Sequence, residues 1–408
     1  MSLPFSLFLA LKYLKPKRTF LSVVTVISVL GVLLGVAVLI IVLSVMSGFD
    51  EMWRDKILSF NAHITVTSYG IIDEEQPIVE RIAKVPGVTG AAPYVQGLVF
   101  IQFQDRVYTP MVRGVDPVRE RTVSKIPECM VAGKFDVEND QVVIGSDLAQ
   151  RLGISVGDKV LVYSPENFVN PDEIRLPEEL TVAGLFEVGM WEFDVGFMIT
   201  SIEKARELYA MEQGAHAIQV MTDDPYRPER VATAIHEALG LDYDVETWMQ
   251  QNRQLFAALR VEKNMMFFLL IFITVVAAFG ITNTLITVTV QKTHEIGLLK
   301  ALGFSSGSIM RVFFWQGWIQ GLIGTVAGTG FGLLVLKYRN GLMYALNRRF
   351  HLELFPKELY RLSEIPAVIS WTDIAIVAGS VMIICTLAGI VPAYRAARLD
   401  PVSALRYE

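Results

Sequence analysis

The chain contains four long stretches without a single charged residue, separated by polar segments. They are Thr19–Phe49, Asn264–Gln291, Val312–Leu336 and Ile374–Tyr394. A helix of about 20 mostly apolar residues crosses the hydrocarbon core of a bilayer, so each stretch predicts one membrane span. The first stretch is too long for the apolar core of a cleaved signal peptide, which has about 7–15 residues. The pattern therefore predicts an α-helical membrane protein with four transmembrane helices at 19–49, 264–291, 312–336 and 374–394.

The polar block at 50–263 alternates between strand and helix patterns. It opens and closes with two similar strand-helix-strand units, at 63–67, 76–85 and 88–94, and at 217–221, 228–239 and 243–247. Two such units commonly form one split, ferredoxin-like sheet with helices on one face. An insertion between them, at about 112–214, is rich in strand patterns. We therefore expect a large α+β domain, built as a split ferredoxin-like or porter-like unit with a β-rich inserted subdomain.

Helical spacing of apolar residues continues past the first span and precedes the second. The segments are 49–58 and 248–263, and neither contains Gly or Pro. The periodicity predicts that each span extends without a break into an amphipathic stalk helix outside the membrane. Such helices could transmit a displacement across the membrane or could merely hold the domain away from the bilayer, and periodicity alone does not decide between the two.

Charge is distributed unevenly between the polar block and the rest of the chain. Residues 50–263 hold 35 acidic and 20 basic residues, whereas the remainder holds 7 acidic and 16 basic ones. Lys and Arg near the ends of spans mark the cytoplasmic side, and they gather in residues 1–18, 292–311 and 395–408. These three segments are predicted to be cytoplasmic, which places the 50–263 domain and the 337–373 loop in the periplasm.

One segment of the insertion, 164–180, is rich in proline. Pro165, Pro171 and Pro177 prevent regular strand pairing and stiffen the backbone. A loop of this length inside a compact domain is commonly either functional or disordered. The segment is therefore a disordered hairpin tip or a protruding arm that grips a partner. Four apolar residues, Phe168, Val169, Ile174 and Leu176, lie on this loop and could make the contact.

The sequence gives no sign of a catalytic centre, a metal site or a cofactor. Residues Gly153–Gly157 match a nucleophile-elbow pattern, but the elbow needs a strand before it and a helix after it. Here a helical stretch, Ser146–Leu152, comes first and a strand, Lys159–Tyr163, follows. His294 is followed four positions later by Leu298 instead of the second His of a zinc-protease motif. There is also no phosphate-binding loop, so we expect any ATP hydrolysis to take place on another subunit.

The loop between the second and third spans contains a short amphipathic helix. It lies within 291–304, and Ile296, Leu299 and Leu302 are expected to line one side of it before Gly303 ends it. The helix could lie on lipid headgroups or could serve as a docking element for a cytoplasmic partner.

Taken with this topology, several short segments resemble one known family along nearly the whole chain. The segments are Val42–Phe49, Val261–Met266, Glu295–Gly303, Pro392–Ala397 and Asp400–Glu408. They are similar to the LolC/LolE permeases of the lipoprotein-releasing system, within the wider group of MacB- and FtsX-like ABC transporter permeases.

The resemblance implies a permease subunit in the bacterial inner membrane that passes lipoproteins to a LolA-like periplasmic chaperone. A separate LolD-like ATPase would dock on the helix carrying Glu295, Ile296, Leu299, Lys300 and Leu302. Lipoprotein acyl chains and membrane lipids would meet the chain at Met46, Phe49, Met265 and Met266. The proline-rich segment (Pro165, Phe168, Pro171, Ile174, Arg175 and Pro177) matches the position of the chaperone-binding hook of LolC-type subunits.

The resemblance also implies a second permease subunit, either LolE-like or another copy of this chain, and no nucleic-acid partner. Two related functions remain as alternatives. A MacB-like exporter would expel periplasmic substrates without a chaperone contact at the hook. An FtsX-like regulator would control a cell-wall hydrolase and transport nothing.

Overall fold

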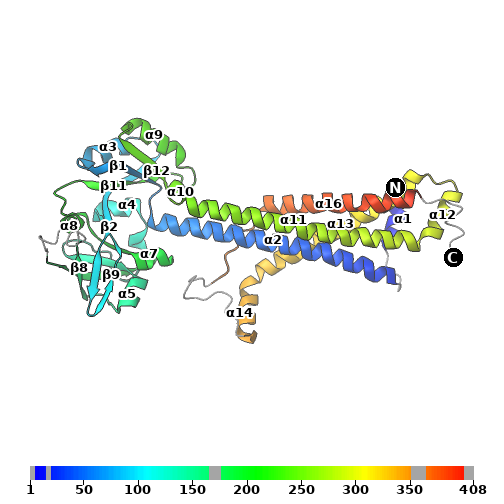
Figure 1. Ribbon diagram of the computed structural model, residues 1–408, viewed down its shortest axis with the longest axis horizontal. Helices are drawn as coiled ribbons and strands as arrows, with labels where there is room; N and C mark the ends of the chain where they lie inside the picture. Colours follow the sequence, from blue (N-terminus) through cyan, green and yellow to red (C-terminus); the bar gives the residue numbers. More distant parts are fainter. Residues whose placement is uncertain (1–4, 15–19, 165–175, 351–363, 399–408) are drawn as a thin grey trace. The chain divides into compact units, whose positions relative to one another are not determined.

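The computed structural model describes residues 5–14, 20–164, 176–350 and 364–398 (Figure 1). The chain divides into two compact units. The helical unit comprises Met1–Glu51, Ala258–Leu352 and Glu364–Glu408, and the α/β unit comprises Met52–Ala257 with Glu353–Ser363. Each unit is considered separately below.

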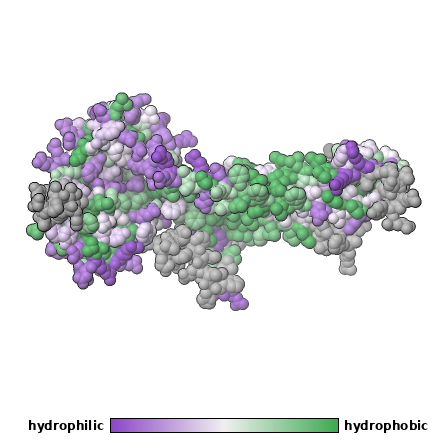
Figure 2. Space-filling view, viewed as in Figure 1, coloured by the Kyte–Doolittle hydropathy of each residue, from purple (hydrophilic) through white to green (hydrophobic). Residues whose placement is uncertain are grey.

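Four long helices dominate the helical unit and confirm the four predicted spans. They are α2 (Phe20–Phe60), α11 (Arg253–Gln291), α13 (Ser306–Lys337) and α16 (Trp371–Ala397), and all are long and apolar enough to cross a membrane. Three shorter helices accompany them: α1 (Phe5–Leu14), α12 (Thr293–Ala301) and α14 (Arg339–Phe350). The face visible in Figure 2 is predominantly hydrophobic along the long helices, as expected of a surface that contacts lipid.

The predicted stalks differ from each other in the structure. The helix α2 continues to Phe60 without interruption, as predicted. The second stalk begins later than predicted: α11 starts at Arg253 and runs without a break into the span, whereas residues Trp248–Gln251 form a separate short helix, α10. Asn252 forms the break, and its side-chain Nδ2 donates a hydrogen bond of 2.8 Å to the carbonyl of Trp248. An Asn side chain that bonds nearby backbone competes with continued helix.

Glycines on α13 allow close packing against α2. A Cβ atom added at Gly324 would lie 2.7 Å from Val32 Cβ, and one at Gly328 would lie 2.6 Å from the carbonyl oxygen of Leu33. Small residues at such crossings let two helix backbones approach each other in a membrane. The α13 helix also buries the side chains of Gln316 and Gln320 completely. No amide atom of these two residues has a hydrogen-bond partner within the described part of the chain.

The first and last elements of the α/β unit form the predicted split ferredoxin-like fold. They are β1 (Ile64–Ile72), α3 (Glu75–Ala83), β2 (Val88–Leu98), β11 (Ala215–Thr222), α9 (Glu229–Leu239) and β12 (Tyr243–Thr247). The strands lie in the order β12-β1-β11-β2, and all neighbours are antiparallel. Apolar side chains of α3 and α9 pack with those of β1 and β11 in one core cluster.

The insertion extends the same sheet. Its strands are β3 (Phe100–Phe103), β4 (Arg106–Tyr108), β5 (Met111–Val115), β6 (Met130–Gly133), β7 (Gln141–Gly145), β8 (Lys159–Tyr163), β9 (Glu178–Phe186) and β10 (Phe197–Ser201). Its helices are α4 (Pro117–Val123), the 3₁₀ turn η1 (Ile126–Glu128), α5 (Ser146–Leu152), α7 (Trp191–Gly196) and α8 (Ile202–Leu208). Strand β5 joins the two parts, because it pairs with β2 on one side and with β10 on the other.

The suspected nucleophile elbow proves to be a turn between α5 and β8, as its sequence context predicts. Gly153 and Gly157 have φ angles of +78° and +96°, which a side chain would disfavour.

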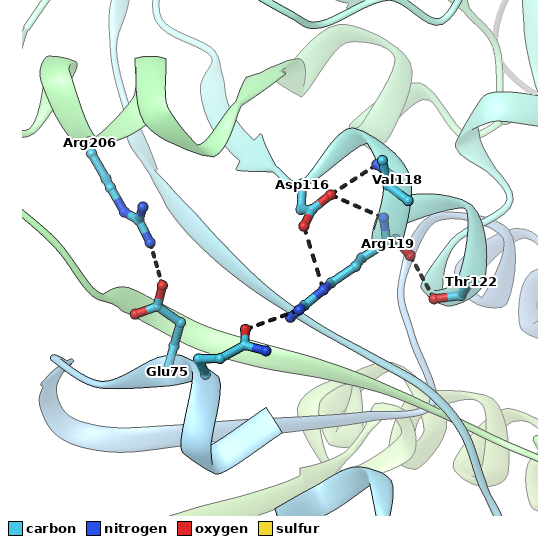
Figure 3. A network of polar contacts seen from close by, with 7 residues as sticks. Glu75, Asp116, Val118, Arg119, Thr122 and Arg206 are labelled. Carbon is cyan, nitrogen blue, oxygen red and sulfur yellow. Dashed lines mark hydrogen bonds and ion pairs between the residues drawn. The ribbon is translucent and has the colours of Figure 1, made fainter. Parts of the chain in front are cut away.

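A polar network ties the start of α3 to two helices of the insertion (Figure 3). Arg206 on α8 forms an ion pair of 2.7 Å with Glu75. Arg119 on α4 donates a hydrogen bond of 3.0 Å to Gln76, and it also lies 3.5 Å from Asp116, which caps α4. These contacts lie between the ferredoxin-like part and the insertion, so they resist independent movement of the two parts.

Candidate functional site

The helical unit contains an apolar cavity of about 460 Å³ between α2, α11 and α16. Most of its lining is aliphatic or aromatic: Leu39, Leu43, Phe267, Ile271, Ile376, Val377, Val381, Ile383 and Ile384. The polar lining residues are Lys263, Asn264, Thr274, Asp373 and Ser380. A cavity with this lining can hold a hydrocarbon chain and can contact a polar group at one end.

The dimensions of the cavity match one leaflet of a bilayer. Its lining on α16 extends from Asp373 to Ile384, and its lining on α11 extends from Lys263 to Thr274. Eleven steps along a helix cover about 17 Å, and half of the hydrocarbon core is about 15 Å thick. Both charged residues belong to the end where α11 and α16 enter the apolar region, so the charges lie at headgroup depth and the rest of the lining at acyl-chain depth.

None of the four predicted lipid-contact residues lines this cavity, although all four lie on α2 and α11, which contribute to its lining. Met265 and Met266 lie between the lining residues Asn264 and Phe267 on α11, and Met265 is exposed. Met46 follows the lining residue Leu43 by about one helical turn, and Met46 and Phe49 are both half-buried. The sequence singled out residues on α2 and α11, two of the three helices that line the cavity, and it did not single out α16, which is distant in the chain.

The segment 364–370 crosses α2 near these residues. The amide of Val368 donates a hydrogen bond of 2.9 Å to the carbonyl of Ser44. A Cβ atom at Gly48 would lie 2.4 Å from the backbone nitrogen of Ala367, so only glycine fits at this position. At the other end of the segment, Arg339 donates a hydrogen bond of 2.6 Å to the carbonyl of Ile365. The segment therefore fastens the beginning of α16 to α2 and to the beginning of α14.

The predicted cytoplasmic helix is α12, and one side of it is fixed to the helical unit. Ile296 is only 1% exposed and belongs to the core of the long helices. Leu299 is half-buried beside Phe5 and Phe304, whose rings stack 4.5 Å apart. Lys300 Nζ donates a hydrogen bond of 2.7 Å to the carbonyl of Ala397, the last residue of α16.

The opposite side of α12 is exposed and has a mixed apolar and charged character. Leu302 is 70% exposed and Leu298 is 49% exposed. Glu295 is also exposed and forms an ion pair with Lys292. The three predicted apolar residues therefore do not share one face, since Ile296 points into the core and Leu302 points away from it. The sequence did not single out Leu298 as part of the accessible surface.

The predicted hook falls mostly outside the residues that the structure describes. Pro165, Phe168, Pro171, Ile174 and Arg175 lie outside them, whereas Pro177 lies just before β9 and is half-buried. The two ends of the segment join β8 and β9, which pair antiparallel from Lys159 opposite Thr181 to Val162 opposite Glu178. The predicted hook segment thus connects two neighbouring strands, as its position in the sequence predicts.

Two protein-family models together match most of the chain. The family model of the MacB-like periplasmic core domain matches residues 25–238, and that of the FtsX-like permease C-terminal region matches residues 267–401. The periplasmic region of MacB from Actinobacillus actinomycetemcomitans gives a TM-score of only 0.33 at 9% identity, covering 49% of this chain and 94% of that one.

Relatives of known name align from end to end. The lipoprotein-releasing system transmembrane protein LolC of Xylella fastidiosa is 32% identical over 99% of both chains, and that of Neisseria meningitidis is 33% identical over 98% of both. LolE of Haemophilus influenzae is 24% identical over 96% of both chains. The chain therefore belongs to the LolC/LolE family of lipoprotein-releasing system transmembrane proteins.

Proposed function

We infer that the chain is a permease subunit of an ABC transporter that releases lipoproteins from the bacterial inner membrane. The end-to-end similarity to LolC proteins carries this inference. The four membrane-spanning helices and the MacB-like periplasmic core domain agree with it. The MacB-like exporter and the FtsX-like regulator are not favoured, because the named full-length relatives belong to lipoprotein-releasing systems.

The complete machine contains partners that each require a surface on this chain. Both LolC and LolE proteins are relatives, so a second permease subunit of the same family completes the membrane part. A separate ATPase binds the accessible side of α12, through Leu298, Leu302 and Glu295. A LolA-like periplasmic chaperone binds the hook at 164–180.

The physical problem for such a machine is the strength with which a bilayer holds acyl chains. Each buried methylene contributes ~0.8 kcal/mol, so one sixteen-carbon chain contributes on the order of a dozen kcal/mol. A triacylated lipoprotein cannot leave the membrane spontaneously at a useful rate. The apolar cavity between α2, α11 and α16 offers an acyl chain a place inside the protein before it reaches the chaperone, and Met46, Phe49, Met265 and Met266 lie on two of these helices. Methionine suits such surfaces because its flexible side chain adapts to different ligands.

The contacts of α12 suggest how ATP hydrolysis on the partner reaches the cavity. The helix is fixed to α16 through Lys300 and to the core of the long helices through Ile296. A displacement of α12 therefore moves α16 and α11, which line the cavity. The cavity would close when these helices approach α2, and the acyl chain would be expelled toward the periplasm.

A release experiment tests the proposed function. The chain is reconstituted in liposomes with its ATPase, its permease partner and a triacylated lipoprotein, and soluble chaperone–lipoprotein complex is measured after ATP is added. We expect release that depends on ATP and on the chaperone. Hydrolysis of ATP without lipoprotein release, together with capture of a cell-wall hydrolase, would instead support the FtsX-like regulator.

The hook needs a separate measurement. A photoreactive amino acid replaces Phe168 in cells, and the captured protein is identified. Capture of a small periplasmic lipoprotein carrier supports the hook assignment. A matched probe at Tyr69, which is fully exposed on β1, controls for nonspecific capture. Equal capture from both positions, or none from Phe168 in a protein that still releases lipoproteins, contradicts the hook.

A further inference from the structure

A buried arginine lies where the end of α2 meets the sheet of the α/β unit. Arg113 on β5 is only 4% exposed. Its guanidinium carbon lies 4.4 Å from the ring centre of Phe60 and 5.3 Å from those of Tyr94 and Phe197. Burial lowers the pKa of Arg113, yet an arginine guanidinium is not deprotonated in proteins at neutral pH. The unit therefore keeps a positive charge in its interior.

The hydrogen bonds of this arginine go mainly to the end of α2. Nη1 donates to the carbonyl of Phe60 at 3.3 Å, and Nη2 donates to the side chain of Asn61 at 3.2 Å. The third bond, from Nε to Gln96, is 2.7 Å long. The last carbonyls of a helix lack partners within the helix and carry partial negative charge, so a cation is favourable there. In this way Arg113 fixes the end of α2 to β5.

A buried carboxylate near this arginine is left incompletely bonded. Glu120 on α4 is 1% exposed, and its Oε1 atom has no hydrogen-bond partner within the described residues. Burial raises the pKa of Glu120, and a hydrogen bond with Ser124 and the charge of Arg113 oppose that rise. In the part of the chain that the structure describes, no carboxylate lies within ion-pair distance of Arg113. Glu120 and Arg113 thus lie in the same interior without forming an ion pair, and a buried polar atom without a hydrogen-bond partner is costly.

We propose that Arg113 is a positioning residue with two alternative partners, the end of α2 in the state seen here and Glu120 when α2 is displaced. Withdrawal of α2 removes the Phe60 carbonyl and the Asn61 side chain from two guanidinium donors. Glu120 then satisfies those donors, and its own unbonded oxygen is satisfied at the same time. A displacement of α2 therefore switches Arg113 between two sets of hydrogen-bond partners, one at the end of α2 and the other at Glu120.

This inference rests on the proposed function, since it assigns a role to these residues in lipoprotein release. The neighbouring contacts of α2 agree with it. The amide of Lys125, just beyond α4, donates a hydrogen bond of 3.3 Å to the carbonyl of Ser59. The segment that directly follows α4 is thus in contact with the last turn of α2, so a movement of α2 also acts on the chain next to the helix that carries Glu120.

The E120Q and R113M variants test the proposal in the reconstituted complex, with ATP hydrolysis, lipoprotein release and thermal unfolding measured together. For E120Q we expect a melting temperature at or above that of the wild type, because the change removes a buried, incompletely bonded carboxylate. We also expect at least a fivefold loss of lipoprotein released per ATP hydrolysed. A purely structural role for Glu120 would not raise stability and lower coupling at once.

The double variant that combines E120Q with R113M provides a second readout, which remains useful if R113M alone is poorly folded. If the two residues act as one pair, E120Q adds no further loss of coupling to R113M. The exposed neighbours Arg121 and Glu128 supply matched controls, R121M and E128Q, which should leave coupling unchanged. Wild-type release per ATP in E120Q overturns the proposal. Absence of release from the wild-type complex would instead contradict the proposed function itself.

Discussion

At the scale of single residues, the buried polar groups of this protein differ in how well they are bonded. Gln316 and Gln320 in α13 have no partner within the described chain, whereas His63 in the α/β unit is bonded on one ring nitrogen. A buried amide without a hydrogen-bond partner lowers the stability of the folded state. A buried neutral imidazole that accepts a hydrogen bond lowers stability when the pH falls far enough to favour its protonation. Two predictions follow from these differences.

Replacement of Gln320 by Met should stabilise the protein. Methionine has a similar shape and lacks polar atoms, so the change removes a desolvated amide that gains no hydrogen bond. We expect the free energy of unfolding to rise by about 1 kcal/mol, measured as a higher melting temperature of the purified protein in detergent. The same change at the exposed Gln291 is the control. A lower melting temperature for Gln320→Met alone would show that the amide is bonded in solution.

His63 should make stability depend on pH in the weakly acidic range. Its Nδ1 accepts a hydrogen bond of 3.0 Å from the amide of Thr222, which requires that nitrogen to be unprotonated. Burial lowers the pKa of His63 below 6.5. The unfolded chain therefore binds a proton near pH 6.5 while the folded chain does not, so stability falls as pH falls below that value.

The expected loss is about 1.4 kcal/mol for each pH unit between the two pKa values. His63→Asn keeps an acceptor at this position without a titrating group, so its melting temperature should fall less between pH 7.5 and 5.5. The exposed His236 is the matched position for comparison. Parallel curves for the wild type and His63→Asn would rule out this contribution.

At the scale of secondary-structure elements, the crossing of the 364–370 segment over α2 depends on one glycine. Gly48→Ala places a methyl group 2.4–2.5 Å from the backbone of Pro366 and Ala367, where neither backbone can yield easily. We expect the segment to move from α2, with a loss of about 1–3 kcal/mol in stability. Gly31→Ala on the same helix is the control, because nothing lies within 4 Å of its added carbon.

The measurement combines the melting temperature with thiol labelling of a cysteine introduced at Val368, in a variant that lacks Cys129 and Cys385. Labelling should be faster with Gly48→Ala than with Gly31→Ala. Equal labelling rates in the two variants would show that the segment does not depend on Gly48.

The elements themselves follow largely from local sequence pattern. Strands β8 and β12 have the residue bounds that alternation and turn residues predict, and the four spans follow from the absence of charge. No comparable sequence pattern predicts the hydrogen bond from the Asn252 side chain to the Trp248 carbonyl, which lies where α10 ends and α11 begins. The same holds for Arg113, whose partners come from α2 and β2 and whose burial becomes visible only once the sheet is assembled.

At the scale of the whole molecule, the proposed function requires surfaces that would meet other subunits. The sequence predicted the helix α12, yet it could not separate residues that fold the helix onto the core from residues that stay accessible. The structure makes that separation, because Ile296 is buried and Leu302 is exposed. The apolar cavity likewise needed the structure, since α16 lies about a hundred residues from α11 in the chain.

This separation predicts opposite outcomes for two variants of α12. Leu302→Asp should leave the melting temperature of the isolated subunit unchanged and weaken ATPase binding at least tenfold, because a charge replaces an exposed apolar contact. Ile296→Ala should lower the free energy of unfolding by about 2–5 kcal/mol, since it leaves a cavity in the core. Binding is measured by co-purification and titration of the ATPase. Tight binding by Leu302→Asp would place the docking surface elsewhere.

The glycine face and the buried amides of α13 also have a consequence for how the protein is made. Of the four spans, α13 has the least apolar window, with a mean hydropathy of 1.7 against 2.6 to 3.2 for the others. Insertion into a bilayer during synthesis depends on apolarity, so α13 gains most from a helix that is already in the membrane. The ribosome produces α2 first, and its Val32 and Val36 are the residues on which Gly324 and Gly328 pack. The order of the spans along the chain thus provides α13 with its partner before α13 itself is synthesised.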